Sequence, residues 1–360
     1  MPARRLTLFA AVLSLAVVAG LPAYAEGRSA RAHDRACSGT PTQVRTLAYP
    51  VQGQTAQALY ALPAHRPRGI VVFDHGYSHT MHSWAKHLAR VADTLGVIAI
   101  APDYRGQVDS PGAKPGDLPT SRGWQVAEGA QDSIAAAQLF DAACGHGGTN
   151  VVYGVSMGGN TSGLVVASKP KDQAGKPLFD YWVDVEGASN VTETYQGARA
   201  LAPANAFAAN ARADIEKEMG GSFESVPQTY AERTVVNRTQ DIAASGIKGV
   251  VMAHGIVDGL VTHDESRQLQ ALLRAQGIPV DMWAAFTHSA TSESGTTLDG
   301  YAPGHDSPFA GHASETSMTQ DVGLAGFAAL TGLYKGVVPT CRETLFDGRT
   351  GITRSTTTGC

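Results

Sequence analysis

The chain has 360 residues, of which 43% are hydrophobic and 17% charged, and its formal net charge at pH 7 is −4. That length supports one large hydrophobic core, within a single α/β domain that carries an insertion. A mildly acidic chain without a basic stripe is a poor candidate for nucleic-acid binding, so we expect no nucleic-acid partner.

The first 25 residues have the three-part layout of a secretory signal peptide. Arg4 and Arg5 precede an almost wholly apolar run over 6–21, and small residues follow at Ala23 and Ala25. The run is shorter than the roughly 20 residues that a spanning helix needs, so we expect no stable membrane anchor. Removal of residues 1–25 would change the net charge from −4 to −6 and leave a secreted chain of residues 26–360.

Apolar runs alternate with helical segments through the middle of the chain, which is typical of a mostly parallel sheet flanked by helices. The predicted strands are 69–73, 97–100, 150–153, 181–185, 249–253 and 280–286. The predicted helices are 83–95, 125–143, 157–168, 266–276 and 318–334. We therefore expect one domain over residues 26–360.

The stretch 187–247 is too long for one strand–helix unit. It contains Ala-rich helical pieces such as 198–219, followed by polar connectors. Two interpretations remain open: a helical lid over the ends of the strands, and a plain surface elaboration.

The segment Gly154-Val155-Ser156-Met157-Gly158 follows a predicted strand and opens a predicted helix. On a sharp strand-to-helix turn the flanking positions leave no room for side chains, and the serine hydroxyl projects from the edge of the sheet. The helix N-terminus behind it favours developing negative charge. We predict Ser156 as a nucleophile; the alternative is a tight glycine turn with an incidental serine.

In this setting the chain resembles the α/β-hydrolase superfamily over about 71–333, and within it the secreted bacterial serine esterases and lipases. The resemblance implies a mostly parallel central sheet flanked by helices, with a helical lid-like insertion at about 187–247. Asp74-His75-Gly76-Tyr77 directly follows a predicted strand and looks like the family's oxyanion loop. By that likeness, the backbone N–H groups of Tyr77 and Met157 would bind the oxyanion.

The acid is expected at Asp258, because the segment 250–258 is similar to the family's acid-bearing strand end. Asp258 would orient the histidine and stabilise its cationic form. Asp264, and Glu186 after an earlier strand, remain weaker alternatives. Asp103, in another segment that resembles the family, is expected to be structural.

The family order places the histidine between the last strand and the last helix, where three candidates occur. His312 has small neighbours and precedes a capping box at 317–320, so we favour it as the base. His305, which follows a glycine, is the first alternative, and His288 is the second.

One group of histidines raises the question of a metal. His75, His79, His82 and His87 are close in sequence, but no acid or cysteine cluster completes a metal shell, so we predict neither a metal nor a cofactor.

The four cysteines, an even number in an exported chain, favour disulfides. Of three possible pairings we favour Cys37 with Cys144 and Cys341 with Cys360.

The expected triad implies acyl transfer to water through an acyl-enzyme on Ser156. By analogy with the family, the favoured substrate is a small-molecule or lipid-like carboxylic ester. The first alternative is a secreted peptidase or aminopeptidase of the same fold, which would need an acid such as Glu186, or one from the insertion, to hold a charged peptide terminus. The second alternative is a non-catalytic binding protein that keeps the fold. A monomer is the default expectation.

Overall fold

The computed structural model describes residues 37–105, 123–144, 148–256, 258–286, 312, 321–347 and 350–360. Within them, one sheet has the strand order β1-β2-β4-β3-β5-β6-β7-β8-β9-β10. Its strands are β1 (Arg45–Val51), β2 (Gln54–Ala61), β3 (Ile70–Asp74), β4 (Ile98–Pro102), β5 (Val151–Val155), β6 (Tyr181–Val185), β7 (Gly249–Gly255), β8 (Val280–Phe286), β9 (Arg342–Asp347) and β10 (Gly351–Thr357). In this order the strands from β4 to β9 are parallel to one another, whereas the pairs β1–β2, β2–β4 and β9–β10 are antiparallel.

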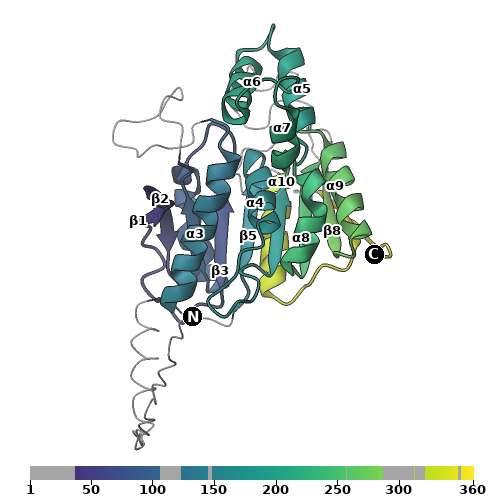
Figure 1. The fold of residues 1–360 in the computed structure, drawn as a ribbon. Coiled ribbons are helices and arrows are strands. Elements are labelled where there is room, and N and C mark those ends of the chain that lie inside the picture. Colours follow the sequence, from purple (N-terminus) through teal and green to yellow (C-terminus); the bar gives the residue numbers. More distant parts are fainter. Residues whose placement is uncertain are drawn as a thin grey trace, which may run out of the picture.

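Helices cover both faces of this sheet (Figure 1). One face carries α3 (Val126–Cys144), α4 (Met157–Ala167), α8 (Thr239–Ser245) and α9 (His263–Ala275). The other face carries η1 (Met81–Trp84), α2 (Ala85–Leu95) and α10 (Asp321–Tyr334), the last of which lies behind the sheet in Figure 1.

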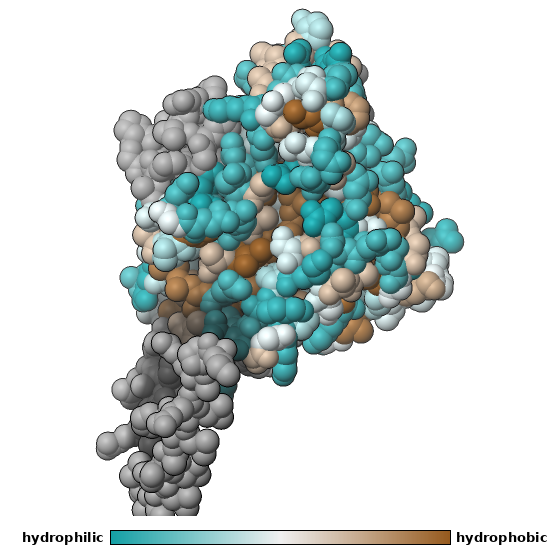
Figure 2. Space-filling model, viewed as in Figure 1, coloured by the Kyte–Doolittle hydropathy of each residue, from teal (hydrophilic) through white to brown (hydrophobic). Residues whose placement is uncertain are grey.

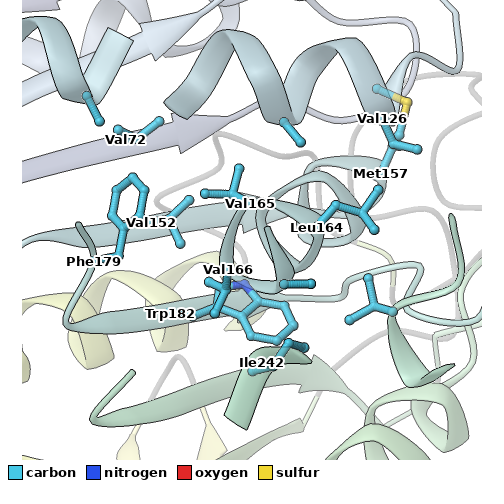
Figure 3. Close-up of a cluster of buried hydrophobic side chains, with 14 of the residues drawn as sticks. Val72, Val126, Val152, Met157, Leu164, Val165, Val166, Phe179, Trp182 and Ile242 are labelled. Atoms are coloured by element: carbon cyan, nitrogen blue, oxygen red, sulfur yellow. The ribbon is translucent and has the colours of Figure 1, made fainter. Parts of the chain in front are cut away.

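The core has two layers because side chains of a strand alternate between the two faces of a sheet. On β3, Ile70 and Val72 pack under α3 and α4, whereas Val71 and Phe73 pack under α2 and α10. Figure 3 shows the first layer, in which Trp182 of β6 lies beside α4 and α8. Strands β3, β4, β5 and β6 have five residues each, and all of these residues are buried. This burial explains why the strands are nearly continuous apolar runs in the sequence.

Between β6 and β7 the chain forms α5 (Val191–Leu201), α6 (Ala206–Met219), α7 (Pro227–Arg233), η2 (Val235–Arg238) and α8. Helices α5, α6 and α7 project beyond the carboxyl ends of the strands (Figure 1), and α8 instead packs against α4. The helical piece expected over 198–219 is therefore two helices. Pro203, which has no N–H to donate, stands between them, and the Asn205 side chain caps α6 by accepting from the Ala208 N–H at 3.0 Å.

Two hairpins that the sequence patterns did not indicate, β1–β2 and β9–β10, extend the sheet at its two edges. Disulfides secure both regions: Cys37 is bonded to Cys144 at the end of α3, and Cys341 is bonded to Cys360 beyond β10. These are the pairs that the sequence favoured.

The surface in the view of Figure 2 is mainly hydrophilic, with hydrophobic residues in smaller patches among the polar ones. Among the described residues, no helix has both the length and the apolar character needed to cross a bilayer.

Candidate active site

Ser156 lies on the sharp turn between β5 and α4. Its φ of +58° is in the left-handed region, where a non-glycine residue costs about 1–3 kcal/mol. Backbone hydrogen bonds hold this turn: the Ser156 N–H donates to the Val185 carbonyl at 2.9 Å, and the Ser156 carbonyl accepts from Ala188 at 3.1 Å. The serine is thereby fixed at the carboxyl end of β5, on the wall of a cavity.

Close backbone contacts explain both glycines of the turn. A Cβ atom on Gly154 would overlap the carbonyl of Gly158, and a Cβ atom on Gly158 would overlap the carbonyl of Asp74. The second contact brings the serine turn directly against the loop that follows β3.

Contacts of His75 with Tyr104 and Asp103 fix the loop that follows β3. The His75 ring is buried and stacks on Tyr104 with ring centroids 3.8 Å apart, and its Nε2 lies 3.4 Å from Asp103 Oδ1. Asp103 therefore contacts the loop rather than His312. Among the described residues, no backbone carbonyl accepts from the N–H groups of Tyr77 or Met157, the two donors expected from the sequence.

Asp258 and His312 form a hydrogen-bonded pair. Asp258 follows β7, and its Oδ1 accepts from the N–H groups of Leu260 and Val261 at 2.9 and 3.0 Å. Its Oδ2 lies 2.7 Å from His312 Nδ1. The Asp258 side chain is fully buried, and that of His312 is 10% exposed.

A second carboxylate faces the same histidine nitrogen. Glu186 directly follows β6, and its Oε2 lies 3.7 Å from His312 Nδ1. Burial opposes ionisation of His312, but the charges of Asp258 and Glu186 and the hydrogen bond to Asp258 raise its pKa to about 9. Burial likewise opposes ionisation of Asp258, but the charge of His312 and hydrogen bonds from His254 and His312 hold the pKa of Asp258 well below its usual value. Both shifts favour the ionised form of each partner, an imidazolium beside a carboxylate.

His254 is a site residue that the motifs did not indicate. Its Nδ1 lies 2.7 Å from Ser266 Oγ, and its Nε2 lies 2.8 Å from the Val261 carbonyl and 3.3 Å from Asp258 Oδ2. Because a carbonyl only accepts, His254 Nε2 carries a proton and also presents it towards Asp258. The available signal was a histidine inside a buried strand, four positions before the acid.

The cavity beside Ser156 has a volume of about 160 Å³. The insertion contributes much of its wall, from α5 and α6. The rest comes from the loop after β3, the serine turn, Trp124 just before α3, the segment after Asp258, and Glu265 of α9. The lining residues are Tyr77, Trp124, Ser156, Glu193, Thr194, Gly197, Ala198, Leu201, Phe207, Ala208, Ala211, Gly259, Leu260, Val261, Thr262 and Glu265. The insertion was recognised in the sequence by its length, which did not indicate which of its residues line the cavity.

Glu186, Asp258 and His312 also offer three donor atoms that lie within 4.8 Å of one another. Carboxylate oxygens and imidazole nitrogen are of a type that binds divalent cations. However, His312 Nδ1 already bonds Asp258 at 2.7 Å, so a cation bound here would have to displace that hydrogen bond.

The remaining expected residues do not join this site. Asp264 is exposed in the first turn of α9. Of the histidines considered as metal ligands, His75 contacts Asp103, and His79 Nδ1 lies 3.0 Å from Ser83 Oγ. His288 and His305 lie outside the described residues, as do the expected signal peptide and the capping box at 317–320.

No family model matches the chain, and no curated protein matches it. Solved structures do resemble it. The uncomplexed acylaminoacyl peptidase of Pyrococcus horikoshii is 14% identical over 81% of this chain and 41% of that chain, with a TM-score of 0.54. A puromycin hydrolase is also 14% identical, over 82% of this chain and 39% of that chain, with a TM-score of 0.53. The chain thus spans about two fifths of the length of these solved chains, and what it shares with them is its architecture, the α/β-hydrolase fold.

Proposed function

We propose that the protein is a serine hydrolase that passes an acyl group from its substrate to Ser156 and then to water. The observation that carries the proposal is the strained Ser156 on a cavity wall, in a fold that places Asp258, which follows β7, in contact with His312. A buried pair of this kind is the arrangement that acyl transfer requires beside a serine nucleophile.

In the proposed reaction, Ser156 Oγ attacks the carbonyl carbon of the substrate and its proton passes to His312 Nε2. The carbonyl oxygen becomes an oxyanion, to which the N–H groups of Tyr77 and Met157 donate. Return of the proton to the leaving group breaks the scissile bond and leaves the acyl-enzyme. Water then attacks in the same way, so that the acid is released and Ser156 is regenerated.

The proposed substrate class differs from the ester that the sequence favoured. Apolar side chains such as Leu201 and Phe207 line the cavity, but the exposed carboxylate of Glu193, in the first turn of α5, lies there too. An acyl tail does not need this charge, whereas a protonated α-amino group would be attracted to it. The names of the solved chains, a peptidase and a puromycin hydrolase, support the same choice. We therefore propose peptides with a free amino terminus as the substrate. Apolar carboxylic esters remain a second candidate, which the apolar part of the wall favours.

The nucleophile is tested with a fluorophosphonate probe on the wild type, Ser156→Ala and Ser168→Ala. Ser168 is the matched control, because it caps the far end of the same helix and its Oγ donates to the Leu164 carbonyl at 2.8 Å. We expect labelling and turnover to disappear only in Ser156→Ala, with a fall in kcat of about 10⁴-fold or more. Normal labelling of Ser156→Ala would refute the proposed function.

The substrate class is tested by comparing aminoacyl p-nitroanilides, their N-acetylated forms and p-nitrophenyl acyl esters of increasing chain length. We expect the free-amine anilides to be cleaved, and Glu193→Gln to raise their KM about tenfold without changing the KM of acyl esters. Glu232→Gln, an exposed acid of α7, is the control. If only esters are cleaved, the second candidate replaces the first. Equal cleavage of the N-acetylated anilides would contradict the proposed requirement for a free amino terminus.

A further inference from the structure

His312 lies between two carboxylates that come from neighbouring strands. Asp258 Oδ2 lies 2.7 Å from His312 Nδ1, and Glu186 Oε2 lies 3.7 Å from the same nitrogen. The two acids follow β7 and β6, which pair in parallel, so both stand at the carboxyl end of the sheet. A single histidine N–H thus meets one acid at hydrogen-bond distance and a second at ion-pair distance.

Glu186 is held in this place by its backbone. Its φ of +51° is in the left-handed region that non-glycine residues rarely adopt, and its N–H donates to the Ala253 carbonyl at 2.8 Å. The preceding residue, Val185, accepts the hydrogen bond from the Ser156 N–H at 2.9 Å. The same short segment therefore fixes the backbone of the serine and directs a buried carboxylate at His312. Strain of this kind persists only where the surrounding structure enforces it.

We propose that Glu186 is a second positioning residue for His312, which stabilises its imidazolium form and accepts the Nδ1–H hydrogen bond when Asp258 is removed. The inference rests on the proposed function, in which His312 is the base. Glu186 touches neither the substrate nor the reacting atoms in this scheme, and it acts through the charge and orientation of the imidazole.

The surrounding charges are compatible with two acids in such a small space. Two carboxylates near one another repel unless cations or donors face them. His312 faces both, the His254 Nε2–H faces Asp258 at 3.3 Å, and Leu260 and Val261 donate to Asp258 from the backbone. Among the described residues, the Glu186 charge also acts on Tyr153 and His254. Burial and that carboxylate both raise the pKa of the Tyr153 hydroxyl, which stays neutral, whereas burial opposes ionisation of His254 and the charges of Asp258 and Glu186 raise its pKa.

The experiment is a double-mutant cycle of Glu186→Gln and Asp258→Ala, read as kcat, KM and the pH profile of kcat/KM. Asp184→Asn is the matched control: it removes a fully buried carboxylate of β6 itself, and the charged group that lowers its pKa is His254 rather than His312. We expect Glu186→Gln to lower kcat about three- to tenfold, leave KM unchanged and move the acid limb of the profile about one unit to lower pH. The control should leave that limb where it is in the wild type.

In the Asp258→Ala background, Glu186→Gln should cost about 100-fold or more in kcat, because no carboxylate then remains to hold the Nδ1–H and stabilise the imidazolium. An equal effect of Glu186→Gln in both backgrounds, together with an unmoved acid limb, would overturn the inference. Should Asp258→Ala fail to fold, which a thermal melt reveals, the pH shift of the single Glu186→Gln variant decides. Activity in Ser156→Ala would instead refute the proposed function itself, so the two failures are distinguishable.

Discussion

At the scale of single residues, the charge state of His312 makes a direct prediction about pH. A base works only when neutral, and the carboxylates around His312 raise its pKa from an ordinary 6.5 to about 9. We therefore expect kcat/KM of the wild type to rise with pH through an acid limb that lies well above 6.5. The sign follows because protonation below this pKa removes the base, while Asp258, with its lowered pKa, stays ionised throughout.

The measurement is kcat/KM between pH 5.5 and 10, with circular dichroism at each pH to show that the fold persists. An acid limb at or below 6.5 would contradict the prediction, since it would mean that the two carboxylates do not hold the proton on His312.

Sequence patterns were informative at this scale where the chemistry is local. The turn that holds the nucleophile can be recognised from consecutive residues. Backbone contacts within or beside the turn leave no room for a Cβ atom at Gly154 or Gly158. The acid and the histidine that accompany Ser156 are not encoded in such a local pattern. Three histidines satisfied the expected order, and only the placement of His312 beside Asp258 links one of them to an acid. Glu186 was noticed only as an alternative acid, because nothing in a linear pattern shows that two acids can share one histidine.

At the scale of elements, one of the contacts that join the insertion to the core is made by a buried side chain, Glu218 of α6. Its Oε2 and Oε1 accept from the N–H groups of Val126 and Ala127, the first residues of α3, at 3.2 and 3.1 Å. The first N–H groups of a helix have no partner within it, so this carboxylate caps α3 from another part of the chain. The side chain is 4% exposed, which makes the contact well shielded from water.

We predict that Glu218→Ala lowers the thermal midpoint by about 3–6 °C, as expected for the loss of about 1–2 kcal/mol of capping. Because α6 supplies Phe207, Ala208 and Ala211 to the cavity wall, KM should rise as well. Scanning calorimetry and steady-state kinetics measure the two effects. Glu232→Ala, on the exposed face of α7, is the control and should change neither. An unchanged KM with a lowered midpoint would show that the contact stabilises α3 without positioning the insertion.

Elements were predictable where burial imposes a simple pattern. The six parallel strands from β3 to β8 are short apolar runs, because helices cover both of their faces. The edge strands were not found, since β1 and β10 carry many exposed or half-buried residues and lack such runs. In the insertion, the helical composition was visible, and Pro203 was an available local signal for the break between α5 and α6. The return of α8 to the core, by contrast, depends on tertiary packing.

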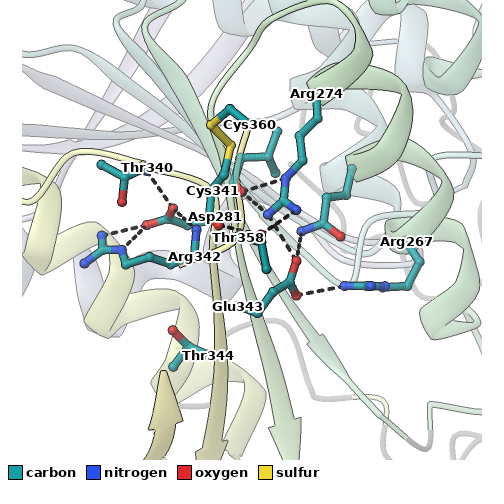
Figure 4. A network of polar contacts seen from close by, with 12 residues as sticks. Arg267, Arg274, Asp281, Thr340, Cys341, Arg342, Glu343, Thr344, Thr358 and Cys360 are labelled. Atoms are coloured by element: carbon teal, nitrogen blue, oxygen red, sulfur yellow. Dashed lines mark hydrogen bonds and ion pairs between the residues drawn. A yellow bond between two sulfur atoms is a disulfide. The ribbon is translucent and has the colours of Figure 1, made fainter. Parts of the chain in front are cut away.

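At the scale of the whole molecule, the two edges of the sheet are secured in different ways. At the C-terminal edge, the Glu343 carboxylate lies 2.8 Å from Arg267 and 2.7 Å from Gln270, both of α9, and Asp281 of β8 binds Arg342 at 2.6 Å (Figure 4). These contacts join β9 to its neighbours independently of the disulfide beside them. At the other edge, Cys37 ties the segment before β1 to Cys144 at the end of α3.

The two disulfides should therefore differ in their effect on stability. Cys37 and Cys144 are 107 residues apart, whereas Cys341 and Cys360 are 19 apart and flank a hairpin that its ladder and the Glu343 contacts already close. Cross-linking a longer loop removes more entropy from the unfolded chain, about 4–5 kcal/mol for roughly 100 residues against about 3 for a short loop. We expect the Cys37→Ala/Cys144→Ala variant to lose about 10 °C in thermal midpoint, and Cys341→Ala/Cys360→Ala clearly less.

Each double variant serves as the control for the other, and melts of the reduced wild type should approach the sum of both losses. A larger loss from the C-terminal pair would mean that β9 and β10 depend on their disulfide, and that the polar contacts in Figure 4 do not hold this edge by themselves.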